Sequence, residues 1–346
     1  MKEKIRVGIV GAGANTRSRH LPNLKSQKGV EIVGICNRTA HSAAEVAKEF
    51  GISKTWTHWR ELVESNEVDA VLIGTWPYLH CPITVTALAS GKHVLTEARM
   101  AMDASEARLM LTESRKNPHL VAQVVPSPYT LRVDATVQDI LRSGALGELL
   151  VVEVRGHAST FIDRDGQFHW RNDRDLSGLN ILGMGIWYEA INRWVGPAKH
   201  VLALDSVFVK QRRDSAGVVR TIRIPDHVDV LAELSCGATA RMVFSAVTGL
   251  GSAPGVWLHG SEGTLHYDLP SDSLHMGQRH DAALKEVNIP AEQAGYWRVE
   301  EEFINAIRGL EKVKLTTFED GLKYMQFTEA VHRSCSLGVK VAVETV

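Results

Sequence analysis

A glycine-rich turn near the start of the chain could bind a phosphate-containing ligand. An apolar, β-branched run covers residues 5–10, Gly11 and Gly13 follow it, and Leu21 and Leu24 indicate a helix beyond the turn. Glycines between a buried strand and a helix let the backbone approach a pyrophosphate, whose charge then lies at the helix N-terminus. This order of elements predicts a dinucleotide site. The residues expected at the phosphates are Gly11, Gly13, Ala14, Asn15 and Thr16.

The end of the next predicted strand, residues 30–36, bears on the choice between NAD and NADP. In a dinucleotide fold the residue at this point faces the adenosine ribose, where an acidic side chain binds the 2′-hydroxyl and repels a 2′-phosphate. Asn37 stands there instead, and the guanidinium of Arg38 can pair with phosphate. The sequence therefore favours NADP, with NAD as the alternative. The competing interpretation is that Arg38 is an ordinary solvated surface charge.

Two further strands should end at the same edge of the sheet. Residues 68–74 form a nearly continuous apolar run, as expected for a parallel strand covered on both faces, and residues 93–97 form the strand after it. Their carboxyl ends face the ligand crevice. For His80 an alternative of equal weight is that it holds its loop in place without touching the cofactor. The residues expected to contact the nicotinamide half are Thr75, Trp76, His80 and Glu97.

Composition narrows the class of protein. The chain has 346 residues, enough for two domains, and its formal net charge of -1 provides no field for gathering nucleic acid or anionic membrane. The N-terminal apolar run is too short to span a membrane and too rich in glycine for a signal sequence. We expect a cytoplasmic protein with a small-molecule substrate and no metal. The cysteines are far apart and show no metal-ligand spacing: Cys36, Cys81, Cys236 and Cys335.

The second half of the chain is rich in β-forming runs separated by Gly, Pro, Asp and Ser. Gly237 indicates a hairpin between two of these runs. Strands in succession with helices at the end suggest an α+β arrangement. The expected strands cover residues 149–160, 201–210, 227–235, 239–247, 256–260 and 264–268, and the expected helices cover 297–309 and 319–337.

These stretches together resemble the glucose-fructose oxidoreductase / inositol dehydrogenase / rhizopine-catabolism (Gfo/Idh/MocA) family. The resemblance implies an α/β Rossmann domain, placed at residues 1–122, and an α+β domain with an open, mostly antiparallel sheet, placed at 123–346. The C-terminal helix could pack back on the first domain. The second sheet would support the substrate pocket and the interface of a homodimer or homotetramer. The matching segments, in the family's order, include VGIVGAGA, CNRTAHSAAEVAKEFG, RSGALGEL, LSGLNILGMGIWYEAINRWVG, GSEGTLHYD and EDGLKYMQFTEAVHRS.

The chain departs from the family where the family carries its chemistry. Glu97 matches the family's glutamate, but Ala98 stands at its lysine and Arg99 at its proline. The family's second motif reads roughly Gly-Gly-Gly-x-x-x-Asp-x-Gly-x-His and corresponds to residues 177–187. Gly183 stands at its aspartate and Trp187 at its proton-transferring histidine. Loss of a general acid/base group costs about two to four orders of magnitude in rate. The bulky and charged replacements suggest a rebuilt binding surface.

Other side chains must then move the proton, and three candidates stay open. Tyr129 stands where relatives often carry an arginine, Tyr188 follows Trp187, and His169 lies in the loop that enters the second domain. A tyrosine or histidine can act as a general acid when a neighbour tunes its pKa, although a single helical tyrosine is more often a packing residue. Arg99 is expected on an anionic or carbonyl oxygen. The residues expected to bind substrate are Arg99, Trp170, Arg171 and Trp187.

Three functions fit this pattern. The first is an NADP- or NAD-dependent oxidoreductase that acts on a hydroxyl or carbonyl group of a sugar, polyol or cyclic diol with non-standard acid/base residues. The second is an enzyme that keeps NAD(P) bound and uses it transiently, such as an epimerase, lyase or glycosidase. The third is a non-catalytic regulator that senses the nucleotide, which Ala98, Gly183 and Trp187 favour. Of these three functions, we expect the oxidoreductase.

Overall fold

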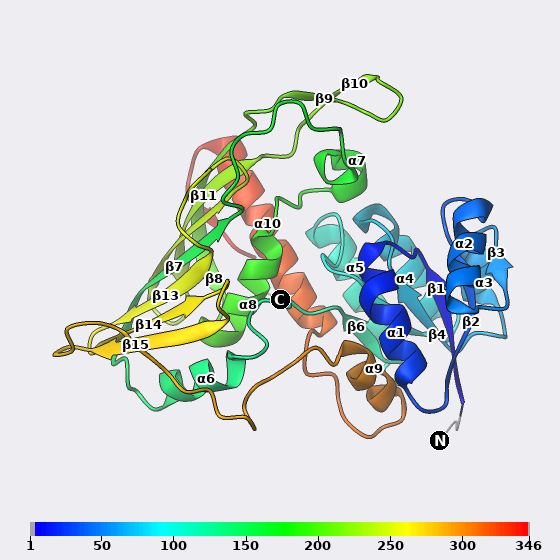
Figure 1. Ribbon diagram of the computed structural model, residues 1–346, viewed down its shortest axis with the longest axis horizontal. Coiled ribbons are helices and arrows are strands. Elements are labelled where there is room, and N and C mark those ends of the chain that lie inside the picture. The colour runs from blue at the N-terminus through cyan, green and yellow to red at the C-terminus, as the bar shows by residue number, and fades with distance from the viewer. Residues whose placement is uncertain (1–3, 345–346) are drawn as a thin grey trace. The chain divides into compact units, whose positions relative to one another are not determined.

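Two compact units make up the computed structural model, which describes residues 4–344. Unit 1 extends to Pro126 and also includes residues 298–322. Unit 2 contains residues 127–297 and the C-terminal part from Lys323. The stretch 298–322, which the sequence analysis placed in the second domain, therefore lies in unit 1. Figure 1 labels the elements of both units.

A six-stranded parallel sheet forms the centre of unit 1, with strand order β3-β2-β1-β4-β5-β6. β4 is buried along its whole length, as a strand covered on both faces must be. Strand order reverses between β1 and β4, so the ligand crevice is expected at the carboxyl ends of these two strands. The strands are β1 (Ile5–Val10), β2 (Val30–Cys36), β3 (Thr55–Trp56), β4 (Ala70–Ile73), β5 (His93–Thr96) and β6 (Ala122–Val124).

Helices connect the strands of unit 1, and local capping sets where they begin. The helix α2 begins at Ala40, because Thr39 Oγ1 accepts a hydrogen bond from Ser42 N at 3.2 Å and caps it. It ends at Gly51, whose φ of 61° is left-handed. The helical segments are η1 (Thr16–His20, a π-helical turn), α1 (Leu21–Ser26), α2 (Ala40–Phe50), α3 (Trp59–Glu64), η2 (Pro77–Leu79, a 3₁₀ turn), α4 (His80–Ala89), α5 (Ala104–Lys116) and α9 (Val299–Ile307).

A nine-stranded sheet forms unit 2, with order β16-β15-β14-β13-β7-β12-β11-β8-β17. Neighbouring strands are antiparallel except β7 and β12, which are parallel. This is the open, mostly antiparallel sheet that the resemblance implied. The strands are β7 (Leu149–His157), β8 (Ala198–Ser206), β11 (His227–Leu234), β12 (Thr239–Ser245), β13 (Gly255–Gly260), β14 (Gly263–Asp268), β15 (Ser273–Gln278), β16 (Lys285–Glu286) and β17 (Val341–Ala342).

Helices cover only one face of this sheet. Tyr188 of α8 (Met184–Val195) stacks on Phe327 of α10 (Phe318–Leu337) with ring centroids 3.7 Å apart. Ser334 of α10 accepts a hydrogen bond at Oγ from Ala203 N of β8 at 2.9 Å. Figure 1 shows both helices on the same side of the strands. The other face is open, with exposed leucines on β8 and β11. Within residues 4–344 no helix is both long and apolar enough to cross a membrane.

The fold class predicted from the sequence is confirmed, and the differences lie at strand ends and in short elements. The strand expected at 201–210 begins at Ala198 and ends at Ser206, because the Asp226 carboxylate binds the next amides and turns the chain. The hairpin at Gly237 is confirmed by the antiparallel pairing of β11 with β12. Elements that the sequence did not predict include α6 (Asp134–Arg142), α7 (Arg174–Ser177), β15 and the small exposed hairpin of β9 (Gln211–Arg213) and β10 (Val219–Thr221).

Candidate functional site

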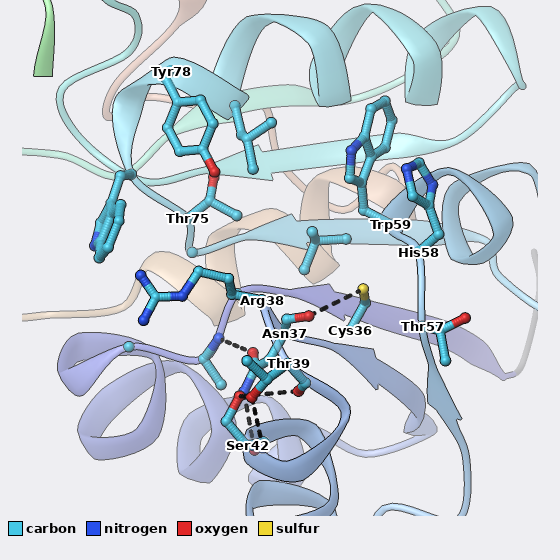
Figure 2. A pocket seen from close by; sticks show the side chains of 17 residues that line it. Cys36, Asn37, Arg38, Thr39, Ser42, Thr57, His58, Trp59, Thr75 and Tyr78 are labelled. Carbon is cyan, nitrogen blue, oxygen red and sulfur yellow. Dashed lines mark hydrogen bonds between the residues drawn. The ribbon is translucent and has the colours of Figure 1, made fainter. Parts of the chain in front are cut away.

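A cavity of about 520 Å³ opens at the carboxyl ends of the parallel strands of unit 1. Its lining comes from the ends of four strands and the loops that follow them: residues 10–13 (β1), 36–39 (β2), 57–59 (β3) and 74–76 (β4). Figure 2 shows side chains from these loops around one space. Volumes of this order are typical of small-molecule sites. The cavity therefore lies at the crevice that the strand order predicts.

Two glycines bring the loops after β1 and β4 into backbone contact. Gly11 has φ 86°, and a Cβ there would lie 2.7 Å from Thr75 N. A Cβ on Gly74 would lie 2.3 Å from Gly11 O and 2.2 Å from Thr16 Oγ1. Neither position has room for a larger side chain. Gly13 is different, because a Cβ there would meet only Gly74 O, at 3.8 Å, and the residue lines the cavity.

Asn37 fixes the glycine turn instead of pointing at a ribose. Its Oδ1 accepts a hydrogen bond from Ala12 N at 2.8 Å, and its Nδ2 donates to Ser42 O at 3.1 Å. The side chain thus joins the turn after β1 to the first turn of α2. Asn37 lines the cavity, both ends of its amide are engaged within unit 1, and its role toward a cofactor stays a prediction.

Arg38 lies at the exposed edge of the cavity, over an aromatic ring. Its guanidinium carbon is 5.2 Å from the centroid of the Trp76 ring, and both residues line the cavity. A guanidinium held over an indole keeps its charge and its donors available to a phosphate. The predicted phosphate-binding residue is therefore placed beside the site.

The two other predicted residues on this loop have different surroundings. Thr75 lines the cavity, and its Oγ1 is buried without a hydrogen-bond partner among the described residues, which suits contact with a ligand. His80 is fully buried, with Nε2 3.0 Å from Thr75 O and Nδ1 2.9 Å from Arg99 O. Burial lowers the pKa of His80. These contacts match the alternative in which His80 holds its loop.

Glu97 follows β5 and is joined to Asn15, just after the glycine turn. Its Oε1 accepts a hydrogen bond from Asn15 Nδ2 and lies 2.9 Å from His20 Nε2. The Glu97 N–H donates to Ile73 O of β4 at 2.9 Å, so the residue sits at the strand ends. His20 was not predicted. It lies one helical turn beyond Thr16 with no motif around it, so the sequence carried no signal for it.

The loop after β3 supplies a wall of the cavity that the sequence analysis missed. Thr57, His58 and Trp59 line it, and the rings of His58 and Trp59 are 5.6 Å apart. β3 has only two residues, too few to show an alternating pattern. Recognising Thr55–Trp56 as a strand would have placed the loop at the carboxyl edge of the sheet.

In unit 2, Tyr129, Gly183 and Trp187, where the sequence was expected to depart from the family, lie together. The rings of Tyr129 and Trp187 are 4.8 Å apart at an angle of 41°. A Cβ on Gly183 would lie 3.5 Å from Trp187 Cδ1 and 3.7 Å from Tyr129 Oη. Trp187 is 3% exposed, while Tyr129 keeps partial exposure. The phenol of Tyr129 thus occupies the space next to the missing side chain at 183.

Tyr188 is a core residue. It is 1% exposed, and its Oη accepts a hydrogen bond from Ala198 N at 2.8 Å. Burial raises the pKa of Tyr188 to about 12. A hydroxyl engaged in the core has no access to a substrate, so Tyr188 is not carried into the proposal below.

His169 begins a 3₁₀ turn, η3 (Trp170–Asn172), and its ring caps that turn. Nδ1 accepts a hydrogen bond from Arg171 N at 3.3 Å, which places the proton of a neutral ring on Nε2. Partial burial and the charge of Arg171 lower the pKa of His169. The ring can therefore donate a hydrogen bond but has no free lone pair for a general base. Arg171 lies over the Trp170 ring, 4.1 Å from its centroid.

Arg99, predicted to bind substrate, lies in unit 1 on the loop after β5. The residue is 8% exposed, and its carbonyl is the partner of His80 Nδ1. The backbone of this loop is therefore fixed. Its role toward a substrate stays a prediction.

Sequence comparisons identify both halves of the chain. Residues 5–124 match a family described as an oxidoreductase family with an NAD-binding Rossmann fold. Residues 135–266 match the GFO/IDH/MocA C-terminal domain. The two matched ranges cover the core of both units.

Similar proteins are named as oxidoreductases. An uncharacterized oxidoreductase of Rhizobium meliloti is 28% identical over 61% of this chain and 64% of its own length, so the chain spans just under two thirds of that relative. A 1,5-anhydro-D-fructose reductase of Ensifer adhaerens is 28% identical over 75% of this chain and 74% of its own. Among solved structures, levoglucosan dehydrogenase in complex with NADH and L-sorbose has a TM-score of 0.86 at 20% identity, covering 99% of both chains.

The contact environment of Gly13 predicts that binding and stability can be separated. In Gly13→Ala we expect the free energy of unfolding to change by less than about 0.5 kcal/mol, because the new methyl meets no crowded atom. The same methyl projects into the cavity and should raise the Kd for NADH or NADPH at least about tenfold. Isothermal titration calorimetry and urea unfolding measure the two effects.

Gly51→Ala is the matched control for Gly13→Ala. Gly51 has a left-handed φ at the end of α2 and no atom within 4 Å of its Cβ position. The substitution should cost about 1 kcal/mol of stability and leave nucleotide affinity unchanged. Unchanged affinity in Gly13→Ala would show that the nucleotide does not use this turn.

Proposed function

Because the chain belongs to the Gfo/Idh/MocA oxidoreductase family with its NAD-binding Rossmann fold, we propose that it transfers hydride between NAD(P) and a hydroxyl or carbonyl group of a sugar, polyol or cyclic diol. The cavity at the ends of β1, β2 and β4 is the chief support. Its glycine turn, open at Gly13, and the buried hydroxyl of Thr75 without a described partner suit a dinucleotide. The names of similar proteins, which refer to sugar compounds, support the substrate class.

Unit 1 would hold the dinucleotide, which when bound supplies the hydride donor or acceptor. The first N–H groups of the segment beginning at Ala14 have no intrahelical partner and would bind the pyrophosphate. Arg38 and Trp76 would contact the adenosine end. Asn37 would act indirectly, by holding the Ala12 amide and with it the shape of the turn.

Unit 2 would supply the proton donor, and Tyr129 is the best placed of the three predicted candidates. Tyr188 is engaged in the core, and His169 has its Nδ1 lone pair committed to a cap. In reduction, Tyr129 Oη would give its proton to the carbonyl oxygen as hydride reaches the carbon. In oxidation the proton would return to the phenolate. Trp170, Arg171 and Trp187 are proposed to bind substrate, with His169 Nε2–H as a further hydrogen-bond donor.

NADP is the proposed preference. No acidic side chain stands at the end of β2, and Arg38 is held at the cavity edge by Trp76. A 2′-phosphate would gain a charge-assisted hydrogen bond from this guanidinium.

The open face of the unit 2 sheet is the proposed contact with a second copy of the chain. Leu202 of β8 and Leu231 of β11 are directly paired across the strands, and Leu204 lies two residues farther along β8. They are 42%, 53% and 70% exposed, respectively. Neighbouring exposed leucines on a sheet face are typical of an interface. A homodimer or homotetramer through this face would cover them.

A nucleotide-sensing regulator is the second candidate, favoured by the buried Trp187 at the position of the family's histidine. The two candidates differ in turnover. Absorbance of the reduced nicotinamide, followed with polyols, ketosugars and cyclic diols in both directions, tests them: turnover with any of these supports an enzyme. No turnover across the panel, with nucleotide bound, would favour the regulator.

Tyr129→Phe removes only the proposed proton donor. We expect kcat to fall by about two to four orders of magnitude while the Kd for the nucleotide stays unchanged, because unit 1 residues line the cavity. Tyr188→Phe is the matched control, since it loses the hydrogen bond from Ala198 and should cost about 1 kcal/mol of stability without a comparable loss of rate. Wild-type kcat in Tyr129→Phe would exclude this tyrosine as the donor.

Arg38→Ala should change nucleotide preference. We expect the Kd for NADPH to rise at least about tenfold and the Kd for NADH to change little, because only NADPH offers a 2′-phosphate. Arg38→Lys keeps the charge and tests the contribution of the planar guanidinium. Equal effects on both nucleotides would mean that Arg38 is a solvated surface charge.

Leu231→Lys should weaken the assembly by placing a charge in the proposed interface. Size-exclusion chromatography with light scattering should then show a smaller species than the wild type. Leu109→Lys, at a 50% exposed leucine of α5 in unit 1, is the matched control and should leave the mass unchanged. A monomeric wild type would refute the interface outright.

A further inference from the structure

A buried ion cluster joins three separate segments of unit 1. His20 comes from η1, Glu97 from the end of β5, and Glu300 from α9 in the stretch 298–322. His20 Nε2 lies 2.9 Å from Glu97 Oε1, and His20 Nδ1 is hydrogen-bonded to Glu300 Oε1. The side chains of His20, Glu97 and Glu300 are 0%, 16% and 1% exposed. The His20 ring therefore lies between two carboxylates and is buried from solvent.

The hydrogen-bond geometry favours the doubly protonated ring. Each nitrogen of His20 lies within hydrogen-bond distance of a carboxylate oxygen, and only the charged ring can donate to both. Asn15 Nδ2 also lies 3.2 Å from His20 Nε2. Burial opposes the charge, but the hydrogen bonds to Glu300 and Glu97 outweigh it and raise the pKa of His20 to about 9. Burial likewise opposes ionisation of Glu97, and the bond to His20 outweighs it and lowers the pKa of that carboxyl.

The cluster reaches the proposed nucleotide site through Asn15. Asn15 is the second residue of the helical segment that begins at Ala14, whose first N–H groups are proposed to bind the pyrophosphate. Its Nδ2 donates to the same Glu97 oxygen that contacts His20. On the far side, Asn23 Nδ2 donates to Glu300 Oε2 at 3.1 Å. The position of the turn thus depends on Glu97, and that of Glu97 on His20.

We propose that His20 is a positioning residue for dinucleotide binding, which holds Glu97 and Asn15 in their binding arrangement only while its ring carries a positive charge. The proposal rests on the proposed function, since it concerns affinity for the same nucleotide. When the ring loses a proton, one nitrogen presents a lone pair to a carboxylate. That contact turns repulsive, one carboxylate moves away, and the turn loses its support.

The sign of the pH dependence follows from the raised pKa. The ordinary pKa of histidine is 6.5, so the contribution of the cluster is fully present below that pH and is lost as pH rises through about 9. His80, whose charge interacts with Glu97, does not titrate in this range, because burial lowers its pKa. Burial raises the pKa of Cys36 in the cavity to about 11.

The test measures the Kd of the full chain for NADPH and for NADH by calorimetry between about pH 7 and about pH 10. For the wild type we expect constant affinity at neutral pH and a loss of about tenfold above the pKa of His20. His20→Gln should bind about tenfold more weakly at neutral pH and show no alkaline loss. His41→Gln, at an 85% exposed histidine side chain of α2, should keep the wild-type profile.

Glu300→Gln separates positioning from simple packing, and it covers the case in which His20→Gln fails to fold. It keeps the shape of the cluster but removes one carboxylate that raises the pKa of His20. The loss of nucleotide affinity at alkaline pH should therefore begin at a lower pH, which a packing role would not cause. A wild-type Kd that stays constant up to about pH 10 overturns the inference. So does a Glu300→Gln variant that loses affinity at the same pH as the wild type. A wild type that binds neither nucleotide at any pH instead refutes the proposed function.

Discussion

Close backbone contact between the loops after β1 and β4 is the constraint on which the nucleotide site depends. Gly11 and Gly74 leave no room for a Cβ, and Thr16 Oγ1 donates to Gly11 O at 3.3 Å across the same contact. Because these loops end adjacent parallel strands, their contact fixes the turn at the point where strand order reverses. Asn37 then fixes the turn from the β2 side through Ala12 N. The cavity is the space that these contacts leave.

In unit 2, Tyr129, Gly183 and Trp187 form one packed group. Tyr129 and Trp187 are in ring contact, and Gly183 has room for little more than a Cβ before those rings. An aspartate at 183 would bring a carboxylate toward the Tyr129 phenol and the Trp187 indole. Residues in contact of this kind are energetically coupled, so a substitution at one of the three affects the other two.

Sequence patterns predicted the fold well because they reflect burial and backbone conformation. The continuous apolar run at β4 and the β-forming run at β11 predicted their strands directly. The two-residue β3 and the exposed β10 gave no such signal, because so few residues cannot show a period and exposed ones do not alternate. The cavity wall after β3 was missed for that reason. His20 was missed because its partners, Glu97 and Glu300, are distant in sequence.

The roles of the histidines were the least predictable feature, because a histidine's chemistry depends on what its two nitrogens bind. His80 has backbone carbonyls at both, His169 uses Nδ1 as a cap, and His20 has a carboxylate at each. Each of these arrangements removes the ring from simple proton exchange with a substrate, since a general base needs an uncommitted lone pair. Residue type suggested acid/base chemistry at His169, but the hydrogen bonds point to positioning. The same reasoning leaves the proton-transfer step of the proposed reaction to Tyr129, whose phenol lies beside Gly183.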